Sequence, residues 1–222
     1  MIAKAGDLES GVAIDGSAFR WTNATIPYTI GSGFSTAYQN TIQQAISYLD
    51  ARTNLCLVPR TTQTNYVTFQ TGDGCSSSVG MRGGQQFITL SERCSVGSVV
   101  HEICDAAGLY HEHTREDRNN FVTINLSNVE PGKEHNFTQN ISGASDYGTY
   151  DYYAIMHYPR TAFAVNSAQN TITPTQTLPA THNIIAINPP VTGTVNLGQR
   201  QGMTQGEINT MNVLYPTACS NS

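Results

Sequence analysis

The segment from His101 to His111 has the residue types and the spacing of a zinc site. His101 and Asp105 are four residues apart, so a helix would place both side chains on one face, one turn apart. Glu102 would reach a metal-bound water as a general base. Gly108 would end the helix and let the chain bring His111 back to the same point. This order of ligands, glutamate and glycine turn is that of zinc peptidases.

The alternative for this segment is a solvated helix face that carries His and Glu by chance. The glycine and the third ligand, which both fall at the expected spacing, favour the metal site over that alternative.

Regular elements are predicted mainly in the first half of the chain. Alternating apolar and polar residues indicate half-buried strands at 25–30, 66–70 and 86–90. Ser35 is a candidate cap for a helix with one apolar stripe, formed by Ile42, Ala45, Ile46 and Leu49.

A second helix is expected from about Gly97 to Ala107, and a last short helix at 205–214. Beyond residue 120, short strand-like pieces such as 121–126 are separated by clusters of Gly, Pro, Asn and Ser. We therefore predict an α+β fold with a largely irregular second half.

Composition limits the partners of this 222-residue chain. A net charge of -5 argues against nucleic acid and anionic membranes, which attract clustered Lys and Arg. The sequence has no apolar run long enough for a membrane span. Sparse charges with abundant Gly, Ser, Thr, Asn and Gln are typical of exported proteins, so we expect an extracellular protein. We also expect a monomer.

Five cysteines are present, and none forms a C-x-x-C pair, which disfavours a cysteine zinc knuckle or a thioredoxin-like site. Disulfides in an exported domain are the better interpretation, with one thiol left over. The five residues are Cys56, Cys75, Cys94, Cys104 and Cys219.

Beyond the helix motif, the sequence resembles the astacin family of metzincin zinc endopeptidases. Residues 111–118 follow the family signature H-E-x-x-R-x-D-R, and 154–158 is similar to the family's Met-turn S-x-M-H-Y, with Ala154 replacing the serine. Trp21 with 26–28 resembles the opening strand, and 197–215 the closing pattern. The resemblance covers about residue 12 to the C-terminus.

The resemblance implies a catalytic domain at 12–222, with a twisted mixed sheet and two long helices in an N-terminal lobe of about 12–110. The C-terminal lobe, about 111–222, would be largely irregular, with the active-site cleft between the lobes. Residues 1–11 would be a propeptide remnant or an added extension. Asp7 in Gly6-Asp7 is a possible inhibitory residue, with a plain turn as the alternative, and a mature terminus near Val12 would link to Glu112.

For the site, the resemblance implies a secreted endopeptidase that cuts polypeptides with Zn²⁺ held by His101 and His111. Glu102 would be the general base, Tyr158 a switchable fifth ligand that donates to the oxyanion, and Met156 the floor beneath the metal. Arg200 would select acidic side chains after the cut bond, or form a structural salt bridge.

The cysteine pairs implied by the resemblance are Cys56–Cys219 and Cys75–Cys94. Cys104 would then be the free thiol, expected as a small buried apolar residue, with a role as a soft metal ligand as the alternative.

Asp105 departs from the family, which has histidine there. Two histidines with one carboxylate can hold catalytic zinc, but aspartate is about two bonds shorter than imidazole, so we expect the metal or the helix to shift. The chain is then an active variant, a degenerate peptide-binding pseudopeptidase, or a recently or deliberately crippled enzyme. We favour the last. An iron oxygenase requires a different ligand order.

Overall fold

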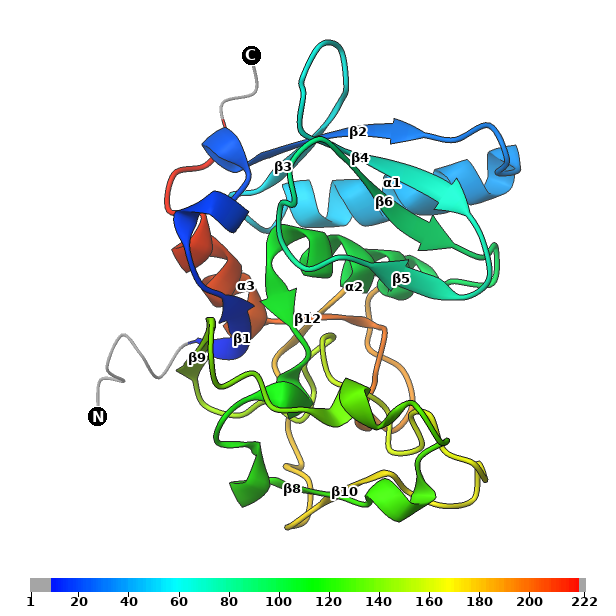
Figure 1. The fold of residues 1–222 in the computed structure, drawn as a ribbon, viewed down its shortest axis with the longest axis vertical. Helices are drawn as coiled ribbons and strands as arrows, with labels where there is room; N and C mark the ends of the chain where they lie inside the picture. The colour runs from blue at the N-terminus through cyan, green and yellow to red at the C-terminus, as the bar shows by residue number, and fades with distance from the viewer. Residues whose placement is uncertain (1–8, 220–222) are drawn as a thin grey trace.

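The computed structural model describes residues 9–219 (Figure 1). Its upper part contains a five-stranded sheet in the order β3-β2-β4-β6-β5. Only β5 runs antiparallel to its neighbour, so the sheet is mixed. In chain order the strands are β2 (Thr25–Ile30), β3 (Cys56–Pro59), β4 (Tyr66–Thr71), β5 (Cys75–Ser77) and β6 (Gln85–Leu90).

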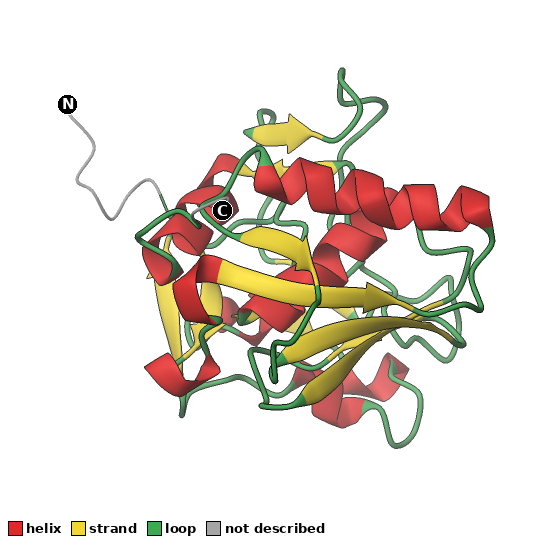
Figure 2. Ribbon diagram, turned by 90° about the horizontal axis from the view of Figure 1, so that it is seen from above, coloured by secondary structure: helices red, strands yellow, loops and turns green. Residues whose placement is uncertain are grey.

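Two long helices, α1 (Thr36–Asp50) and α2 (Val96–Ala107), pack against each other and cover one face of this sheet (Figure 2). The Ser35 hydroxyl caps α1 by accepting from the Tyr38 N–H, and the predicted apolar stripe of α1 is buried. Ten of the twelve residues of α2 are buried, so this helix runs through the interior between the upper and lower parts of the molecule (Figure 1).

The lower part of the molecule is mostly loops and short pairs of strands (Figure 1). β1 lies between β7 and β9 in an antiparallel sheet, β8 pairs with β10, and β11 pairs with β12. The final helix α3 (Gln205–Leu214) packs on β1 and β12. The strands are β1 (Ser10–Ile14), β7 (Leu109–Tyr110), β8 (Val122–Ile124), β9 (Ala144–Gly148), β10 (Ile172–Pro174), β11 (Ile184–Ala186) and β12 (Gly202–Thr204).

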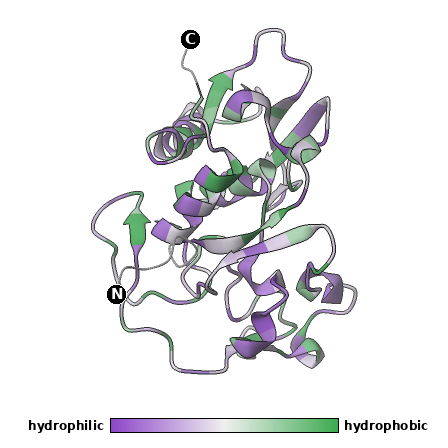
Figure 3. Cartoon of the chain, turned by 90° about the vertical axis from the view of Figure 1, so that its left-hand side faces the viewer, coloured by the Kyte–Doolittle hydropathy of each residue, from purple (hydrophilic) through white to green (hydrophobic). Residues whose placement is uncertain are grey.

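The two parts have separate cores of unequal size. The larger core joins the upper sheet to α1, α2 and α3 and includes Ile155 and Met156. The smaller one lies in the lower part and contains Val122, Val129, Phe137, Tyr150, Tyr152, Ile172 and Leu197. Figure 3 shows the same contrast, because the lower segments are largely hydrophilic and the hydrophobic stretches concentrate on the sheet and helices.

The predicted α+β class is confirmed. The predicted strands and the two predicted helices of the first half are present, as is the predicted C-terminal helix. The predicted strand at 121–126 is shorter, spanning only Val122–Ile124. Both disulfides are confirmed, and Cys104 is the free, buried thiol. None of the helices in residues 9–219 is long and apolar enough to cross a bilayer.

The N-terminal boundary stays a prediction. β1 begins at Ser10, where Ser10 and Gly11 pair with Gly148 and Tyr147, so the bond between residues 11 and 12 lies inside a strand. Asp7 lies outside the described residues, and its inhibitory role is a prediction too.

Candidate metal centre

Three of the predicted ligands converge at the end of α2. His101 and Asp105 come from the helix and His111 from the segment after β7, and their ligand atoms all lie within 4.8 Å of one another. The two histidine Nε2 atoms are 3.1 Å apart. Carboxylate oxygens of Asp105 lie 3.9 Å from His101 Nε2 and 3.7 Å from His111 Nε2.

Asp105 lies beside the two histidine nitrogens, but each nitrogen has a different Asp105 oxygen nearest to it, so the expectation that the metal or the helix must shift stays a prediction. Ligand atoms around a tetrahedral zinc lie about 3.4 Å apart when zinc–ligand bonds are about 2.0–2.2 Å long. The two histidine nitrogens lie slightly closer together than that value, and the Asp105 oxygens lie slightly farther from them. The Asp105 Oδ1 atom is buried and has no hydrogen-bond partner among the described residues, which is a deficit that a cation would fill.

The position of His101 is set by the backbone of the Met-turn. Its Nδ1 lies 2.9 Å from the Ile155 carbonyl oxygen. Because a carbonyl oxygen only accepts, Nδ1 carries the hydrogen and Nε2 keeps its lone pair for a metal. Burial lowers the pKa of His101 well below its ordinary value, so the ring is neutral, as a ligand must be.

His111 arrives through the turn that the glycine makes possible. Gly108 has a φ of 109°, in the left-handed region, and ends α2 as predicted. The short strand β7 that follows pairs with Val12 and Ala13 of β1. This pairing fixes the direction of the chain just before His111. Burial, followed by the neighbouring His101, also lowers the pKa of His111.

Glu102 and Asp105 form a coupled pair beside the histidines. Burial raises the pKa of Glu102 to about 7, although a hydrogen bond from Asp105 opposes this. Burial, and then the nearby Glu102 carboxylate, raise the pKa of Asp105 well above its ordinary value. Because the pKa of Asp105 is raised, a cation at this carboxylate competes with a proton.

Both residues line a cleft of about 520 Å³ between the two parts of the molecule, together with Tyr158, Arg200 and residues of β5. Burial raises the pKa of Tyr158, so its hydroxyl stays protonated as a hydrogen-bond donor at neutral pH. Its ring lies 4.4 Å from the His111 ring. Met156 is buried in the larger core.

Arg200 extends into the cleft from the C-terminal part. Its Nη1 donates to the carbonyl oxygens of His157 and Gln199, at 3.2 and 2.9 Å. Among the described residues no carboxylate lies within salt-bridge distance of it, so the alternative of a structural salt bridge is wrong.

Cys104 is fully buried, with its sulfur 4.0 Å from the Met203 sulfur. It is not part of the ligand cluster, which favours the packing role over the ligand role.

Glu112 is fully buried beneath the site. Its Oε1 accepts from the Asp151 N–H at 2.8 Å and lies 3.7 Å from Arg115 Nη1. Its Oε2 has no partner among the described residues. The predicted link from Glu112 to a mature amino terminus remains a prediction.

Several residues of the site were not found from the sequence. His113 is fully buried and stacks on the Tyr158 ring at 4.2 Å. Asn136 and Phe163 line the cleft, and Phe163 has a positive φ of 51°. His113 occupies a variable position of the signature, and the other two lie in loops without periodicity, so no sequence signal identifies them. Glu207 lies outside the cleft lining, and it had a usable signal in the T-x-x-E capping box at Thr204.

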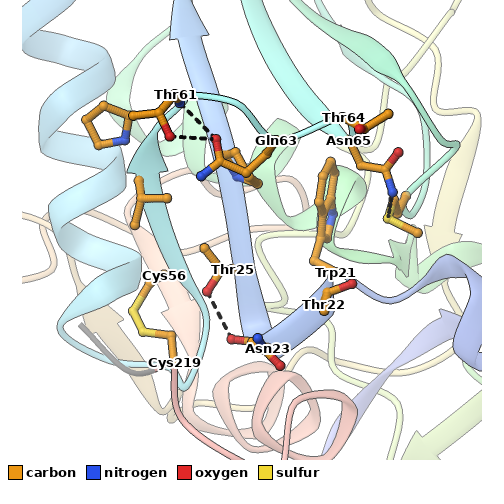
Figure 4. Close-up of a pocket in the computed structure, with 14 residues that line it drawn as sticks. Trp21, Thr22, Asn23, Thr25, Cys56, Thr61, Gln63, Thr64, Asn65 and Cys219 are labelled. Atoms are coloured by element: carbon orange, nitrogen blue, oxygen red, sulfur yellow. Dashed lines mark hydrogen bonds between the residues drawn. A yellow bond between two sulfur atoms is a disulfide. The ribbon is translucent and has the colours of Figure 1, made fainter. Parts of the chain in front are cut away.

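A larger hollow of about 760 Å³ lies on the upper sheet, between Trp21 and the Cys56–Cys219 disulfide (Figure 4). Its wall consists of Thr, Asn, Gln and apolar side chains, and it contains no titratable group besides the disulfide-bonded cysteines. It therefore lacks the groups for acid–base or metal chemistry, and the smaller cleft is the candidate active site.

Comparison with known proteins points to one family. Residues 14–216 match the family model described as Astacin, a family of peptidases. Among curated relatives, High choriolytic enzyme 2 of Oryzias latipes is 36% identical over 192 residues, covering 86% of this chain and 63% of that protein. Zinc metalloproteinase nas-13 of Caenorhabditis elegans is 34% identical over 207 residues, covering 91% and 42%.

The chain thus spans less than two thirds of these relatives. Among solved structures, High choriolytic enzyme 1, a hatching enzyme zinc-protease from Oryzias latipes, matches with a TM-score of 0.76 and 32% identity. The match covers 92% of this chain and 99% of that chain. Myroilysin, at 16% identity and a TM-score of 0.62, shares the fold.

Proposed function

The chain belongs to the astacin family of peptidases, and we propose that it is a zinc endopeptidase in which Asp105 is the third protein ligand. The convergence of His101, Asp105 and His111 beside Glu102 carries this proposal. The description of the similar fish enzyme as a zinc-protease supports zinc as the ion.

When bound, Zn²⁺ would lower the pKa of a water molecule and polarise the peptide carbonyl. Glu102 faces the same cleft and would accept a proton from the water and return it to the leaving amine. The Tyr158 hydroxyl would donate a hydrogen bond to the oxyanion that develops on the substrate. Both groups lie at the cleft wall and need no change of fold to act.

The proposed substrates are polypeptides that enter the cleft from solvent. Arg200 is a cation at the cleft wall without a carboxylate partner among residues 9–219, so an acidic side chain after the cut bond is its proposed target. Two disulfides support secretion, because such bonds persist in oxidising compartments. We also propose that the chain acts as a monomer.

Asp105 is proposed to weaken this peptidase rather than abolish it. A carboxylate adds negative charge at the metal, which stabilises the bound cation but makes its water less acidic than three neutral imidazoles would. The alternative function is a non-catalytic peptide-binding domain. This alternative is favoured by the hydrogen bond between Asp105 and Glu102 in the metal-free protein, because it engages the carboxylate that a peptidase would use as its base.

Zinc content and casein cleavage separate these two functions. We would compare the parent chain, Asp105→His, and Glu102→Gln as a control for contaminating peptidases. The peptidase proposal predicts one zinc per chain, slow cleavage by the parent, faster cleavage by Asp105→His and none by Glu102→Gln. If Asp105→His binds zinc and still cleaves nothing, the binding-domain alternative replaces the proposal.

A further inference from the structure

Glu207, near the start of α3, is a buried carboxylate without an assigned role in the chemistry. It is 1% exposed. It belongs to the capping box of the helix, because Oε2 accepts from the Thr204 N–H at 2.9 Å and the Thr204 hydroxyl accepts from the Glu207 N–H at 3.3 Å. These capping contacts are local to the start of α3, and they do not require the Glu207 carboxylate to be buried.

The same carboxylate also binds a segment about fifty residues earlier in the chain. Oε2 accepts from the Ile155 N–H at 2.9 Å and Oε1 from the Met156 N–H at 3.0 Å. Among the described residues no cation lies within salt-bridge distance of it, so backbone N–H groups replace the water that this carboxylate lost on burial.

The carbonyl groups of these two residues face the metal centre. Ile155 O accepts from His101 Nδ1 at 2.9 Å, and Met156 O accepts from the Glu112 N–H at 3.1 Å, directly after His111. The turn at 155–156 therefore contacts both histidine segments with its carbonyls and Glu207 with its amides.

We propose that Glu207 is a positioning residue for the metal centre. Its carboxylate holds the turn at 155–156, and the turn holds His101 with the hydrogen on Nδ1 and the lone pair on Nε2. Groups that orient a ligand in this indirect way change metal affinity by about 10- to 100-fold when they are removed. The inference rests on the proposed function only for the identity of the ion as zinc.

Glu207→Gln tests this with Thr204→Ala as the matched control. The glutamine keeps the shape of the side chain but places an NH₂ group against one of the two turn amides. Thr204→Ala removes the hydroxyl from the same capping box and leaves both contacts of Glu207 with the turn in place. A simple helix-capping role would make the two variants behave alike.

Two readouts distinguish positioning from capping. In the metal-free proteins, ¹⁵N NMR of His101 should show the Nδ1–H tautomer in the parent and in Thr204→Ala, and a mixture of tautomers in Glu207→Gln. Chelator competition should give a zinc dissociation constant about 10- to 100-fold higher for Glu207→Gln and an unchanged constant for Thr204→Ala.

An unchanged tautomer and an unchanged zinc constant in folded Glu207→Gln would overturn the proposal, as would an equal loss of affinity in Thr204→Ala. Should Glu207→Gln fail to fold, hydrogen exchange in the parent decides: the Ile155 and Met156 amides must be protected, and rapid exchange would overturn it. A parent that binds no zinc contradicts the proposed function instead, because the tautomer is measured without metal.

Discussion

The two sides of the cleft are held together in different ways. The upper part supplies His101, Glu102 and Asp105 from a helix packed in the larger core. The lower part supplies Tyr158 from loops with a small core of their own. In the lower part, hydrogen bonds of buried polar side chains connect the loops where apolar packing is limited. The fully buried guanidinium of Arg115, for example, donates to backbone carbonyls of β1 and β9.

This difference teaches that apolar packing fixes the helix that carries His101, Glu102 and Asp105, whereas buried hydrogen bonds fix the loops of the lower part. Arg118 Nη1 donates to the carbonyls of His113 and Phe137, and Glu207 holds the turn at 155–156. Removing one buried polar group should therefore cost more in the lower part than removing one methyl group in the upper part.

The largest expected effect is that of Arg115→Met. The change leaves the carbonyls of Gly11, Tyr147 and Gly148 and the buried Glu112 carboxylate without their cation. We expect a loss of about 3–5 kcal/mol in the free energy of unfolding, measured by urea denaturation. A loss below about 1 kcal/mol would be no more than the contribution of a typical single hydrogen bond. It would mean that hydrogen bonds do not dominate the stability of the lower part.

Tyr158→Phe tests the catalytic role that we propose for Tyr158 in the lower part. Loss of the hydroxyl should reduce kcat about 10²- to 10³-fold, as removal of an oxyanion donor does, with KM and zinc content little changed. Steady-state kinetics on a peptide substrate measures this in the Asp105→His background, where turnover is faster. A fall in zinc content with kcat retained would assign Tyr158 a structural role.

Acid should weaken zinc binding through Asp105. Its pKa is raised, chiefly by burial, so the metal-free protein holds a proton that zinc must displace. Affinity should fall by about tenfold per pH unit below that raised pKa, since one proton is released. Calorimetry in two buffers of different ionisation enthalpy measures the released proton, and release no greater than in Asp105→Asn would contradict this assignment.

The smallest effect is expected for Ile103→Val on the packed side. Ile103 is fully buried in α2, and the lost methyl should cost about 0.5–1.5 kcal/mol in urea denaturation, without changing zinc content. A cost equal to that of Arg115→Met would remove the contrast between the two parts.

The same contrast explains how much the sequence predicts. In the upper part, helices and strands follow apolar periodicity, and Gly108 marks the turn that delivers His111. In the lower part, strands such as β8 are only three residues long, so they show no periodic signal. Contacts such as that between Glu207 and Ile155 join residues 52 positions apart, so they leave no periodic signal either. The reach of Asp105 cannot be predicted from side-chain length alone, because it also depends on the approach of His111.

The most direct test of the account is the structure of the zinc complex of the unaltered chain, by crystallography or X-ray absorption. The account predicts two histidine nitrogens at about 2.0–2.1 Å and an Asp105 oxygen at about 2.0–2.2 Å from the zinc. Zinc held by His101 and His111 alone, with Asp105 still hydrogen-bonded to Glu102, would contradict it.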